Sequence, residues 1–526
     1  MKYALALLTV LLLLSPDQIS AAEESAFNPR VFGAVGDGKT KDTVAIQRAI
    51  DAAAKAGGTV LLDRGVFLSG TLHLKSGVTL RIQKGATLLG SAEHADYHKN
   101  RWLALIEARD AHDIAITGGG IVDGQGELLA ADVVRLMKAG KLGDAPDSRR
   151  PSEPNRPQVI ELVNCVRVTV RDITLKNSAC WVQTYINCED LMLDRVTVRS
   201  TAYWNNDGLD IVDCRRVSVT HCDIDSADDG ICLKSGDPKR TCENVRIEDC
   251  TVRSSASALK FGTSSHGGFK HIAVRCLRIH DTFRSAIAIE SVDGAAIEDI
   301  DIADVQAKNT GNAIFIRLGH RNQDGQFGSV RNVRIRDVSV EIPATAPDAG
   351  YPFAGPPVRA PHNVFPSSIA GLPGHPICDI TLKNITITTA GGARREVAEV
   401  PLEKLSLVPE QADRYPEFSM FGELPAWGFY VRHAKNIVIE NVHLHAAAAD
   451  FRPAMVFDDV QSPTLNGLRI TPVGEIPAIV TRDVRGMKMT PPQIPGTKLL
   501  VREIPSGVEL RNTPVKQMGT GLSGKK

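Results

Sequence analysis

The sequence is poor in aromatic residues and carries no excess of either charge. Its 526 residues include only 4 Trp, 7 Tyr and 15 Phe, and its 61 Lys and Arg cancel its 61 Asp and Glu. A zero net charge argues against the broad positive surface that binding to nucleic acid requires. Ten cysteines in a chain of this length do not make a small disulfide-rich scaffold. Because 43% of the residues are hydrophobic and only 23% are charged, wholesale disorder is also excluded.

The one long hydrophobic run lies at the N-terminus. Lys2 precedes residues 3–14, which are apolar except for Thr9, and small residues suited to cleavage end at Ala22. This arrangement is typical of a secretory signal peptide, so we expect removal of residues 1–22 and a secreted or periplasmic protein. The alternative is an N-terminal anchor helix, but a bilayer needs about twenty apolar residues to be crossed. We expect no membrane association after the signal peptide is removed.

One apolar pattern recurs along most of the chain. Each copy has two apolar residues separated by one residue, then two intervening residues, then two more apolar residues separated by one. The copies start at Val168, Leu191, Val217, Val245, Ile272, Ile300, Val333, Ile380 and Ile437. The intervals are 23, 26, 28, 27, 28 and 33 residues, and the last two lengthen to 47 and 57. Alternation predicts strands. A period of about 20 to 30 residues indicates one coil of a solenoid.

A second apolar triplet lies at a similar offset within successive repeats. It begins at Cys180, Leu209, Ile231, Leu259, Ile287 and Ile314. Two or three short strands per coil predict an all-β fold, a parallel β-helix, in which stacked coils bury one continuous apolar column. Length then adds coils, so we expect residues 23–490 to form one domain. A β-propeller or several β-sandwiches are the alternative, but each propeller blade needs about 40 residues and four strands.

Both ends of the predicted solenoid and two interruptions can be placed. Asp42 and Thr43 can begin an amphipathic helix that Gly57 and Gly58 end, and this helix would cover the open apolar end. Its predicted apolar face holds Val44, Ile46, Ala49, Ile50 and Ala53. Residues 343–376 and 390–430 leave the repeat and are predicted to be long loop inserts. Residues 491–526 are predicted to form a C-terminal tail.

Four cysteines stand three residues before the first strand of successive repeats. They are Cys165, Cys188, Cys214 and Cys242. Coils about 4.8 Å apart would allow disulfides between stacked cysteines in an exported protein. The interpretation we favour is a column of buried thiols that pack like small apolar residues. A metal site is disfavoured, because the sequence has no clustered Cys or His at ligand spacing.

Acidic residues gather at the second strand of two adjacent repeats. Asp207 and Asp229 each precede a Gly and a strand, 22 residues apart, so the coils should stack them. With Asp228 they would form a patch of three carboxyl groups. Like charges a few ångströms apart raise the pKa of one of them, which is what a general acid beside a general base requires. The alternatives are solvated turn residues or a calcium site.

These residues carry a resemblance to a known family. Asn206-Asp207, followed by the segment from Asp228-Asp229-Gly to Lys234-Ser-Gly, resembles the signature of glycoside hydrolase family 28, the polygalacturonases and rhamnogalacturonan hydrolases. The opening segment from Phe32 onward resembles the start of pectin-acting β-helix enzymes. The resemblance covers about residues 28–460.

The resemblance implies the right-handed, pectin-lyase-like form of the parallel β-helix and hydrolysis of α-linked galacturonate chains with inversion. By position, it implies that Asp228 is the general acid that protonates the leaving oxygen. It implies that Asp207 and Asp229 are the bases that hold and activate water. Inversion requires a gap between carboxyl groups that is wide enough for that water.

Two motifs of the family are missing. The histidine of its Gly-His-Gly motif falls at Ser257, and His266 follows nine positions later. Its Arg-Ile-Lys motif, which binds galacturonate carboxylates, falls at Ala288-Ile289-Glu290. The usual carboxylate clamp is therefore absent.

Other side chains can replace the clamp. Alternation directs four charged residues outward in successive coils: Lys234, Lys260, Glu290 and Arg317. We hypothesise that the three cations line the sugar subsites and that Glu290 binds hydroxyls or a cation. The alternative is a solvated ladder of charges.

Two further residues are candidates for substrate binding. His266 either contacts substrate or merely occupies a Gly-rich turn. Trp204 either stacks on a sugar ring or packs beside its turn.

The sequence thus predicts an exported, monomeric glycoside hydrolase that needs neither cofactor nor metal and acts on an acidic, plant-type (pectic) polysaccharide or oligosaccharide. The inserts after residues 340 and 387 would wall off one end of the groove, which favours exo action or short substrates. A polysaccharide lyase or epimerase on the same fold is one alternative, with Lys260 or Arg317 as base. A non-catalytic glycan-binding β-helix is another, because a fold does not fix a function.

Overall fold

The structure is a computed structural model that describes residues 26–98, 101–322, 325–347, 350–351, 361–471, 476–490, 493 and 501–505. The predicted signal peptide lies outside the described residues. Among the helices in the described ranges, none has the length and apolar character needed to cross a bilayer.

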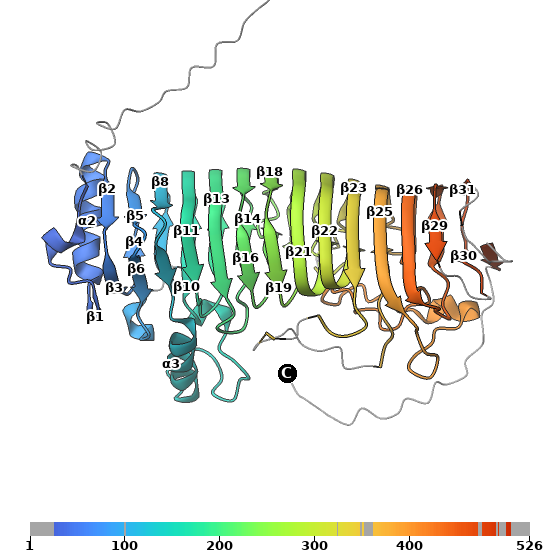
Figure 1. Ribbon diagram of the computed structural model, residues 1–526, viewed down its shortest axis with the longest axis horizontal. Coiled ribbons are helices and arrows are strands. Elements are labelled where there is room, and N and C mark those ends of the chain that lie inside the picture. Colours follow the sequence, from blue (N-terminus) through green and yellow to red (C-terminus); the bar gives the residue numbers. More distant parts are fainter. Residues whose placement is uncertain are drawn as a thin grey trace, which may run out of the picture.

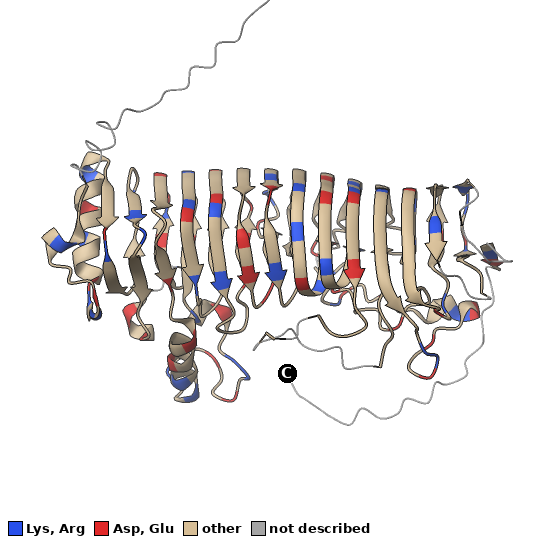
Figure 2. Ribbon diagram, in the orientation of Figure 1, with Lys and Arg blue, Asp and Glu red and all other residues tan. Residues whose placement is uncertain are grey.

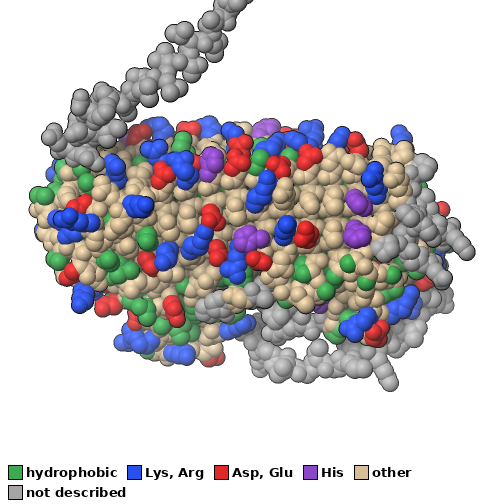
Figure 3. Space-filling view, in the orientation of Figure 1, with side chains coloured by type: hydrophobic (Ala, Val, Ile, Leu, Met, Phe, Trp, Pro, Cys, Tyr) green, Lys and Arg blue, Asp and Glu red, His purple; other side chains and the backbone are tan. Residues whose placement is uncertain are grey.

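The chain forms a right-handed parallel β-helix, as predicted. Short strands stack side by side along one long axis, and the chain advances from one end to the other coil by coil (Figure 1). Charges of both signs are interspersed along the solenoid rather than separated (Figure 2). The visible face likewise mixes cationic, anionic and histidine side chains (Figure 3). The zero net charge therefore reflects local mixing of charges.

The N-terminal coils contain short strands. These are β1 (Asp37–Lys41), β2 (Thr59–Leu62), β3 (Gly65–Ser69), β4 (Leu72–His73), β5 (Thr79–Ile82), β6 (Ala86–Gly90), β7 (Ala104–Arg109), β8 (His112–Thr117) and β9 (Ile121–Asp123).

The central coils carry the acidic residues. Their strands are β10 (Gln158–Val163), β11 (Val166–Lys176), β12 (Gln183–Ile186), β13 (Glu189–Ser200), β14 (Leu209–Val212), β15 (Arg215–Thr220), β16 (Asp223–Ser226), β17 (Ile231–Ser235), β18 (Cys242–Glu248), β19 (Thr251–Ser254) and β20 (Leu259–Ser265).

The C-terminal coils contain both long strands, of up to 24 residues, and short strands of two to seven residues. These are β21 (Gly268–Ser291), β22 (Ala296–Leu318), β23 (Ser329–Ile342), β24 (Ser367–Ala370), β25 (Ile377–Gly391), β26 (Phe429–Ala448), β27 (Met455–Gln461), β28 (Thr464–Asn466), β29 (Arg469–Thr471), β30 (Ile479–Arg482), β31 (Lys488–Met489) and β32 (Val501–Ile504).

Helices are few in the described ranges. The α-helices are α2 (Thr43–Ala56) and α3 (Gly126–Lys138), and the 3-10 helices are η1 (Pro29–Phe32), η2 (His94–Asp96), η3 (Glu153–Asn155) and η4 (Leu402–Leu407).

The predicted apolar column is present in full register. The nine residues that start the repeat, from Val168 to Ile437, pair with one another from coil to coil in parallel strands. Each is at most 3% exposed. Burying a Val, Leu or Ile side chain contributes about 1.5–3 kcal/mol before the cost of chain entropy, so this column is a large share of the driving force for folding.

The second apolar row is confirmed from Leu209 to Ile314, where each triplet pairs with the next. The triplet predicted at Cys180 is wrong by three residues, because Tyr185 of β12 is the residue that pairs with Ile211. The buried Tyr185 hydroxyl donates a hydrogen bond of 2.9 Å to Gln183 Oε1. Because this hydrogen bond satisfies both side chains, two polar residues can face inward. A search for alternating apolar residues therefore misses this strand.

The predicted capping helix is α2, which ends at Gly57 in the left-handed conformation. Four of its five predicted apolar residues are buried, but Val44 is 62% exposed. Asp42 does not cap the helix. Its carboxylate instead accepts hydrogen bonds from the backbone N–H groups of Val35 and Gly36, at 2.7 and 3.0 Å. It therefore fixes the preceding loop.

The cysteine column is a ladder of buried free thiols. Cys165, Cys188, Cys214 and Cys242 are each 0% exposed. The backbone N–H of Cys188 lies 3.3 Å from Cys214 Sγ in the next coil. The structure therefore contains the column of buried thiols that the sequence favours.

The inserts and the tail contain regular structure. Within the segment 343–376, β24 pairs with β22 and so continues the solenoid. Within 390–430, η4 precedes the return to the coil at β26. Beyond residue 490, β32 pairs in parallel with β30, inside the segment predicted as a tail.

Candidate active site

A cleft of about 670 Å³ lies where β14, β17 and β20 run side by side. The loops around α3 and the C-terminal inserts project from one side of the solenoid (Figure 1). The charged residues that line the cleft are Arg101, Arg149, Arg150, Glu153, Asp207, Asp228, Asp229, Lys234, Lys260 and Arg284. All three predicted catalytic residues are thus brought together in one cleft.

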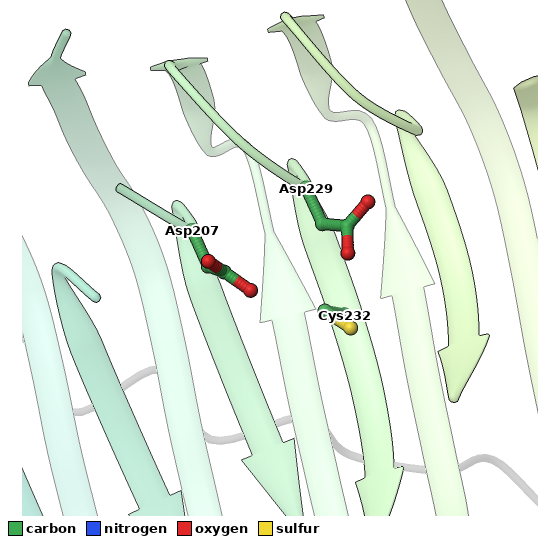
Figure 4. Close-up of side chains that lie close together, drawn as sticks. All are labelled: Asp207, Asp229 and Cys232. Atoms are coloured by element: carbon green, nitrogen blue, oxygen red, sulfur yellow. The ribbon is translucent and has the colours of Figure 1, made fainter. Parts of the chain in front are cut away.

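Asp207 and Asp229 stack one coil apart, as their spacing predicts. They stand before paired strands, and Figure 4 shows both carboxylates beside Cys232. One oxygen of each carboxylate and Cys232 Sγ all lie within 4.8 Å of one another. A Cβ on Gly208, which follows Asp207, would lie 2.8 Å from Gly230 O and 2.4 Å from a methyl group of Ile224. Only glycine lets the coils approach this closely beside the acids.

Two buried lysines neutralise these acids. Lys234 Nζ lies 3.2 Å from Asp207 Oδ2 and also bonds Asp210. Lys260 Nζ lies 2.9 Å from Asp229 Oδ2. Each lysine is at most 8% exposed. They line the cleft as predicted, but their ammonium groups are counterions of the acids.

The surroundings of Asp228 and Asp229 move their pKa values in opposite directions. Burial raises the pKa of Asp228, and the neighbouring Asp229 charge raises it further. Burial also acts on Asp229, but Lys260, Arg284 and Lys234 outweigh it and lower the pKa of Asp229 below its ordinary value. One carboxyl group therefore keeps its proton to higher pH than an ordinary Asp, while its neighbour stays ionised.

Asp207 shares its lysine with a second acid. Burial raises the pKa of Asp207 well above its ordinary value, and Lys234 offsets only part of this effect. Burial also raises the pKa of Asp210 to about 6. A raised pKa favours the protonated form of Asp207, which differs from the ionised base implied by the resemblance.

Local contacts hold Asp228 at the open face of the cleft. It is partly exposed, whereas Asp207 and Asp229 are each 4% exposed. Asp228 Oδ1 accepts a hydrogen bond of 2.9 Å from the Asp229 N–H, and Asn205 Nδ2 lies 3.5 Å from Oδ2. Its backbone carbonyl accepts a bond of 2.6 Å from Ser254 Oγ. A proton on Asp228 is therefore accessible to a ligand.

The buried Asn206 fixes the turn that carries Asp207. Its Nδ2 donates to the carbonyls of Ser178 and Cys180 at 3.0 and 2.9 Å. Its Oδ1 accepts from Ser200 Oγ and from the backbone N–H of Ala202, at 2.9 and 3.1 Å. The Asn-Asp pair in the sequence thus combines a structural residue with an acid.

Trp204 also lines the cleft. The guanidinium carbons of Arg149 and Arg150 lie 5.1 and 5.6 Å from the centre of its ring. Glu290 lies behind the cleft instead, 1% exposed, with its Oε2 4.0 Å from Lys260 Nζ. Burial raises the pKa of Glu290 to about 7.

Two predicted substrate-binding residues lie outside this cleft. Arg317 is 1% exposed, because the insert before β26 packs over the face to which alternation directs it. Its guanidinium donates to the carbonyls of Gly371 and Glu410 at 3.0 and 2.6 Å. His266 is exposed on the turn after β20, and its backbone N–H donates to Ser235 O.

Sequence reasoning missed several residues that line the cleft. Arg101, Arg149 and Arg150 come from segments without the repeat, and Tyr415 comes from the insert before β26. Arg284 lies on β21, three residues before the apolar triplet at Ile287. Its charge was the only available signal, because Arg284 lies inside β21 at a register shift between Thr282 and Ser285.

The donor set suits proton transfer better than a metal ion. Asp207, Asp229 and Cys232 offer three atoms close enough to share a cation. However, Lys234 Nζ lies 3.2 Å from Asp207 and 3.1 Å from Cys232 Sγ, and Lys260 Nζ lies against Asp229. A cation would have to displace two ammonium groups that already supply the positive charge.

Comparison with known proteins defines the class of enzyme and then the family. The parallel β-helix with stacked carboxyl groups in a charged cleft is that of a glycoside hydrolase. The family model of glycosyl hydrolases family 28 matches residues 55–347, more than half of the chain, so the chain belongs to this family. The resemblance, the fold and the enzyme class predicted from the sequence are therefore confirmed.

The relatives are distant. A "Probable polygalacturonase" of Vitis vinifera is 25% identical over 424 residues, which cover 72% of this chain and 78% of the relative. An "Exo-poly-alpha-D-galacturonosidase" of Dickeya chrysanthemi is 23% identical over 389 residues, 62% and 64% of the two chains. The solved exopolygalacturonase of Thermotoga maritima shares the fold with a TM-score of 0.57 at 21% identity, covering 81% of this chain and 95% of that one.

Proposed function

We propose that this glycoside hydrolase cleaves α-glycosidic bonds in a galacturonate-containing, pectic polysaccharide or oligosaccharide. The observation that carries the proposal is the grouping of Asp207, Asp228 and Asp229 in one cleft, with Asp228 partly exposed and Lys260 2.9 Å from Asp229. In this setting, burial raises the pKa of Asp228 and the nearby cations lower the pKa of Asp229. An acid and a base are needed together at the scissile bond, and this pair supplies both at one pH.

In the proposed mechanism, Asp228 is the general acid. Its proton passes to the glycosidic oxygen as the bond to the sugar breaks. Asp229, held ionised by Lys260, takes a proton from the attacking water. Asp207, whose oxygen lies within 4.8 Å of Asp229, orients that water. Attack from the face opposite the leaving group inverts the anomeric centre.

The cations of the cleft support an acidic substrate. Arg101, Arg149 and Arg150 line it, and the fork of an arginine matches a carboxylate. Relatives named for polygalacturonate support the same substrate class. Of the predicted substrate-binding residues, Lys234, Lys260 and Trp204 line the cleft, and Glu290 lies 4.0 Å from Lys260. His266 and Arg317 are not among the described residues that line this cleft. The cleft therefore does not support a role for either residue in binding substrate.

Exo action and export are part of the proposal. Tyr415, from the insert before β26, reaches the cleft beside Lys260, so the insert supports a groove closed on that side. Residues 1–22 have the pattern of a signal peptide, which supports a secreted or periplasmic location. That the protein acts as a monomer is part of the proposal as well.

A reducing-end assay over a panel of pectic polymers tests the function. We expect sugar release by the wild-type enzyme and a loss of at least about 100-fold in Asp228→Asn. NMR of the first product distinguishes inversion from retention. A rapid fall in viscosity would contradict exo action, and ultraviolet-absorbing products would indicate a lyase instead. If no pectic polymer is cleaved, the proposed substrate class is wrong.

A further inference from the structure

Two acids share one lysine beside the proposed catalytic pair. Lys234 Nζ lies 3.2 Å from Asp207 Oδ2, and it also donates a hydrogen bond to Asp210 Oδ1. In the described ranges, neither acid has a second cationic side chain at ion-pair distance. The ammonium group of Lys260 is no substitute, because it lies 2.9 Å from Asp229. Two carboxyl groups therefore face one ammonium group.

The ammonium group of Lys234 is enclosed on its other sides. The centre of the Trp181 ring lies 4.4 Å from Nζ, which is close enough for a cation–π contact. Cys232 Sγ lies 3.1 Å from Nζ and donates a hydrogen bond of 3.0 Å to the carbonyl of Gly262. These contacts fix the ammonium group between the two acids, so its charge acts on them rather than on a ligand.

The two acids differ in what else they can contact. Asp210 is 0% exposed, and its Oδ2 has no hydrogen-bond partner in the part of the chain that the structure describes. Asp207 lines the cleft, so it can meet water or a ligand there. If Lys234 moved wholly to Asp207, Asp210 would be buried without any counterion, which is the costlier arrangement. The ammonium group therefore belongs with Asp210.

Charge balance then places a proton on Asp207. A buried carboxylate without its own counterion takes up a proton rather than stay charged. Burial raises the pKa of Asp207 well above its ordinary value, and Lys234 offsets only part of this effect. Burial raises the pKa of Asp210 only to about 6, because Lys234 opposes it more strongly, so Asp210 is ionised at neutral pH.

We propose that Asp210 is a positioning residue of the reaction: it holds the Lys234 ammonium away from Asp207, so that Asp207 carries a proton and donates a hydrogen bond to the attacking water. The water oxygen accepts this bond and points one hydrogen at Asp229, which leaves its second lone pair facing the sugar. As the glycosidic bond breaks, the water gives that hydrogen to Asp229, and Asp207 keeps its own proton. This inference rests on the proposed function, because it concerns the same water.

The first experiment measures kcat and KM on a pectic polymer that the wild-type enzyme cleaves. Asp210→Asn removes the charge at constant size, so Lys234 should pair with Asp207, which then ionises and donates no bond. We expect kcat to fall about tenfold with little change in KM. Adding Lys234→Met removes the ammonium group and returns the proton to Asp207, so kcat should rise about threefold or more above that of Asp210→Asn. A double variant no more active than Asp210→Asn would overturn the proposal, since two merely structural losses cannot restore activity.

The matched control is another buried aspartate with basic partners. Asp458 is 1% exposed and pairs with Arg432 and Arg482, and none of these three residues lines the cleft. Asp458→Asn should lower the thermal midpoint and leave kcat as in the wild type. A fall in kcat as large as that of Asp210→Asn would overturn the specific role of Asp210.

Infrared spectroscopy tests the proton on the folded protein without turnover. At neutral pH, the difference between the wild type and Asp207→Asn should contain the carbonyl band of a protonated carboxyl group. The band should be missing from Asp210→Asn and return when Lys234→Met is added. If the difference contains the band of an ionised carboxylate instead, the proposal is wrong, even where Asp210→Asn does not fold. If no polymer is cleaved but the band follows the expected course, the hydrolase proposal fails while the assignment of the proton stands.

Discussion

The ammonium group of Lys260 donates a hydrogen bond of 3.2 Å to the hydroxyl of Tyr415, across 155 positions of the sequence. The same ammonium group lies 2.9 Å from the carboxylate of Asp229. One lysine therefore joins an insert on the outside of the solenoid to an acid that we propose to be catalytic. We therefore expect the insert to affect the chemistry through this contact, in addition to lining the cleft with Tyr415.

Loss of the Tyr415 hydroxyl should slow turnover without unfolding the protein. Tyr415→Phe removes a partner of Lys260 and leaves its pairing with Asp229. We expect kcat to fall about three- to tenfold and the free energy of unfolding to change by less than about 1 kcal/mol. Tyr351→Phe is the control, since its hydroxyl lies 3.3 Å from Asp225 outside the cleft. An equal loss of activity in both variants would contradict a specific role of Tyr415.

The pH dependence of hydrolysis should change when Lys260 loses its charge. Lys260 and the other cations keep the pKa of Asp229 low, so Lys260→Gln should raise that pKa. The acidic limb of the kcat/KM profile, where Asp229 takes up its proton, should then move to higher pH. The basic limb, where Asp228 loses its proton, should move less. An unmoved acidic limb in Lys260→Gln would show that Asp229 is not the base.

Glu290 should destabilise the protein at high pH. Burial raises the pKa of Glu290 to about 7, against an ordinary value of 4.5. Because the folded-state pKa is the higher one, the folded protein holds the proton more tightly, and the stability that this supplies is lost as the pH rises toward 7. Glu290→Gln should therefore be more stable than the wild type well above pH 7, by at most about 3 kcal/mol, relative to their difference at acid pH. Urea unfolding at two pH values measures this difference, and a difference independent of pH would refute it.

Asn206 should be far more important for stability than an asparagine whose hydrogen bonds are exposed. Asn206→Ala leaves the buried carbonyls of Ser178 and Cys180 without these partners and frees the turn before Asp207. We expect a loss of about 2–4 kcal/mol in urea unfolding, together with lower activity. Asn384→Ala, which removes two exposed bonds of 2.8 Å, one donated to Asp337 and one accepted from Asn441, is the control and should cost clearly less than Asn206→Ala. Similar losses in the two variants would contradict this reading of Asn206.

Thiol titration should separate buried from accessible cysteines. All ten are free, and Cys276 and Cys378 are the two that are not buried. A thiol reagent should therefore modify at most two in the folded protein and all ten after unfolding. Fewer than ten after unfolding, without reductant, would mean that a disulfide forms in the protein.

The repeated part of the fold could be predicted closely from the sequence. From Val168 to Ile437, each apolar start residue stacks on the next, because one inward face must stay apolar in every coil. The stacking of Asp207 on Asp229 followed from the same register. In the second apolar row, only the triplet at Cys180 was predicted wrongly, because Tyr185 and Gln183 fill the interior there with a hydrogen-bonded polar pair.

The rest of the site depends on segments that have no period. Alternation correctly directs Arg317 outward, but it gives no sign that an insert covers that face. Arg149, Arg150 and Tyr415 reach the cleft through loops whose paths depend on single contacts, such as those of Arg156. Such contacts between distant positions leave no local pattern in one sequence.

The stacking of Asp207 on Asp229 has a consequence for how this molecule can change in length. Their separation follows from the spacing between adjacent coils, a backbone dimension of about 4.8 Å that is the same everywhere along the axis. Whole coils toward the C-terminus could be lost or duplicated without altering that separation. A single residue inserted between Asp229 and Ile231, the first paired residue of β17, would shift the acid relative to the strand and alter the separation at once. The reach of the enzyme along a glycan and the geometry of its acids can therefore vary independently.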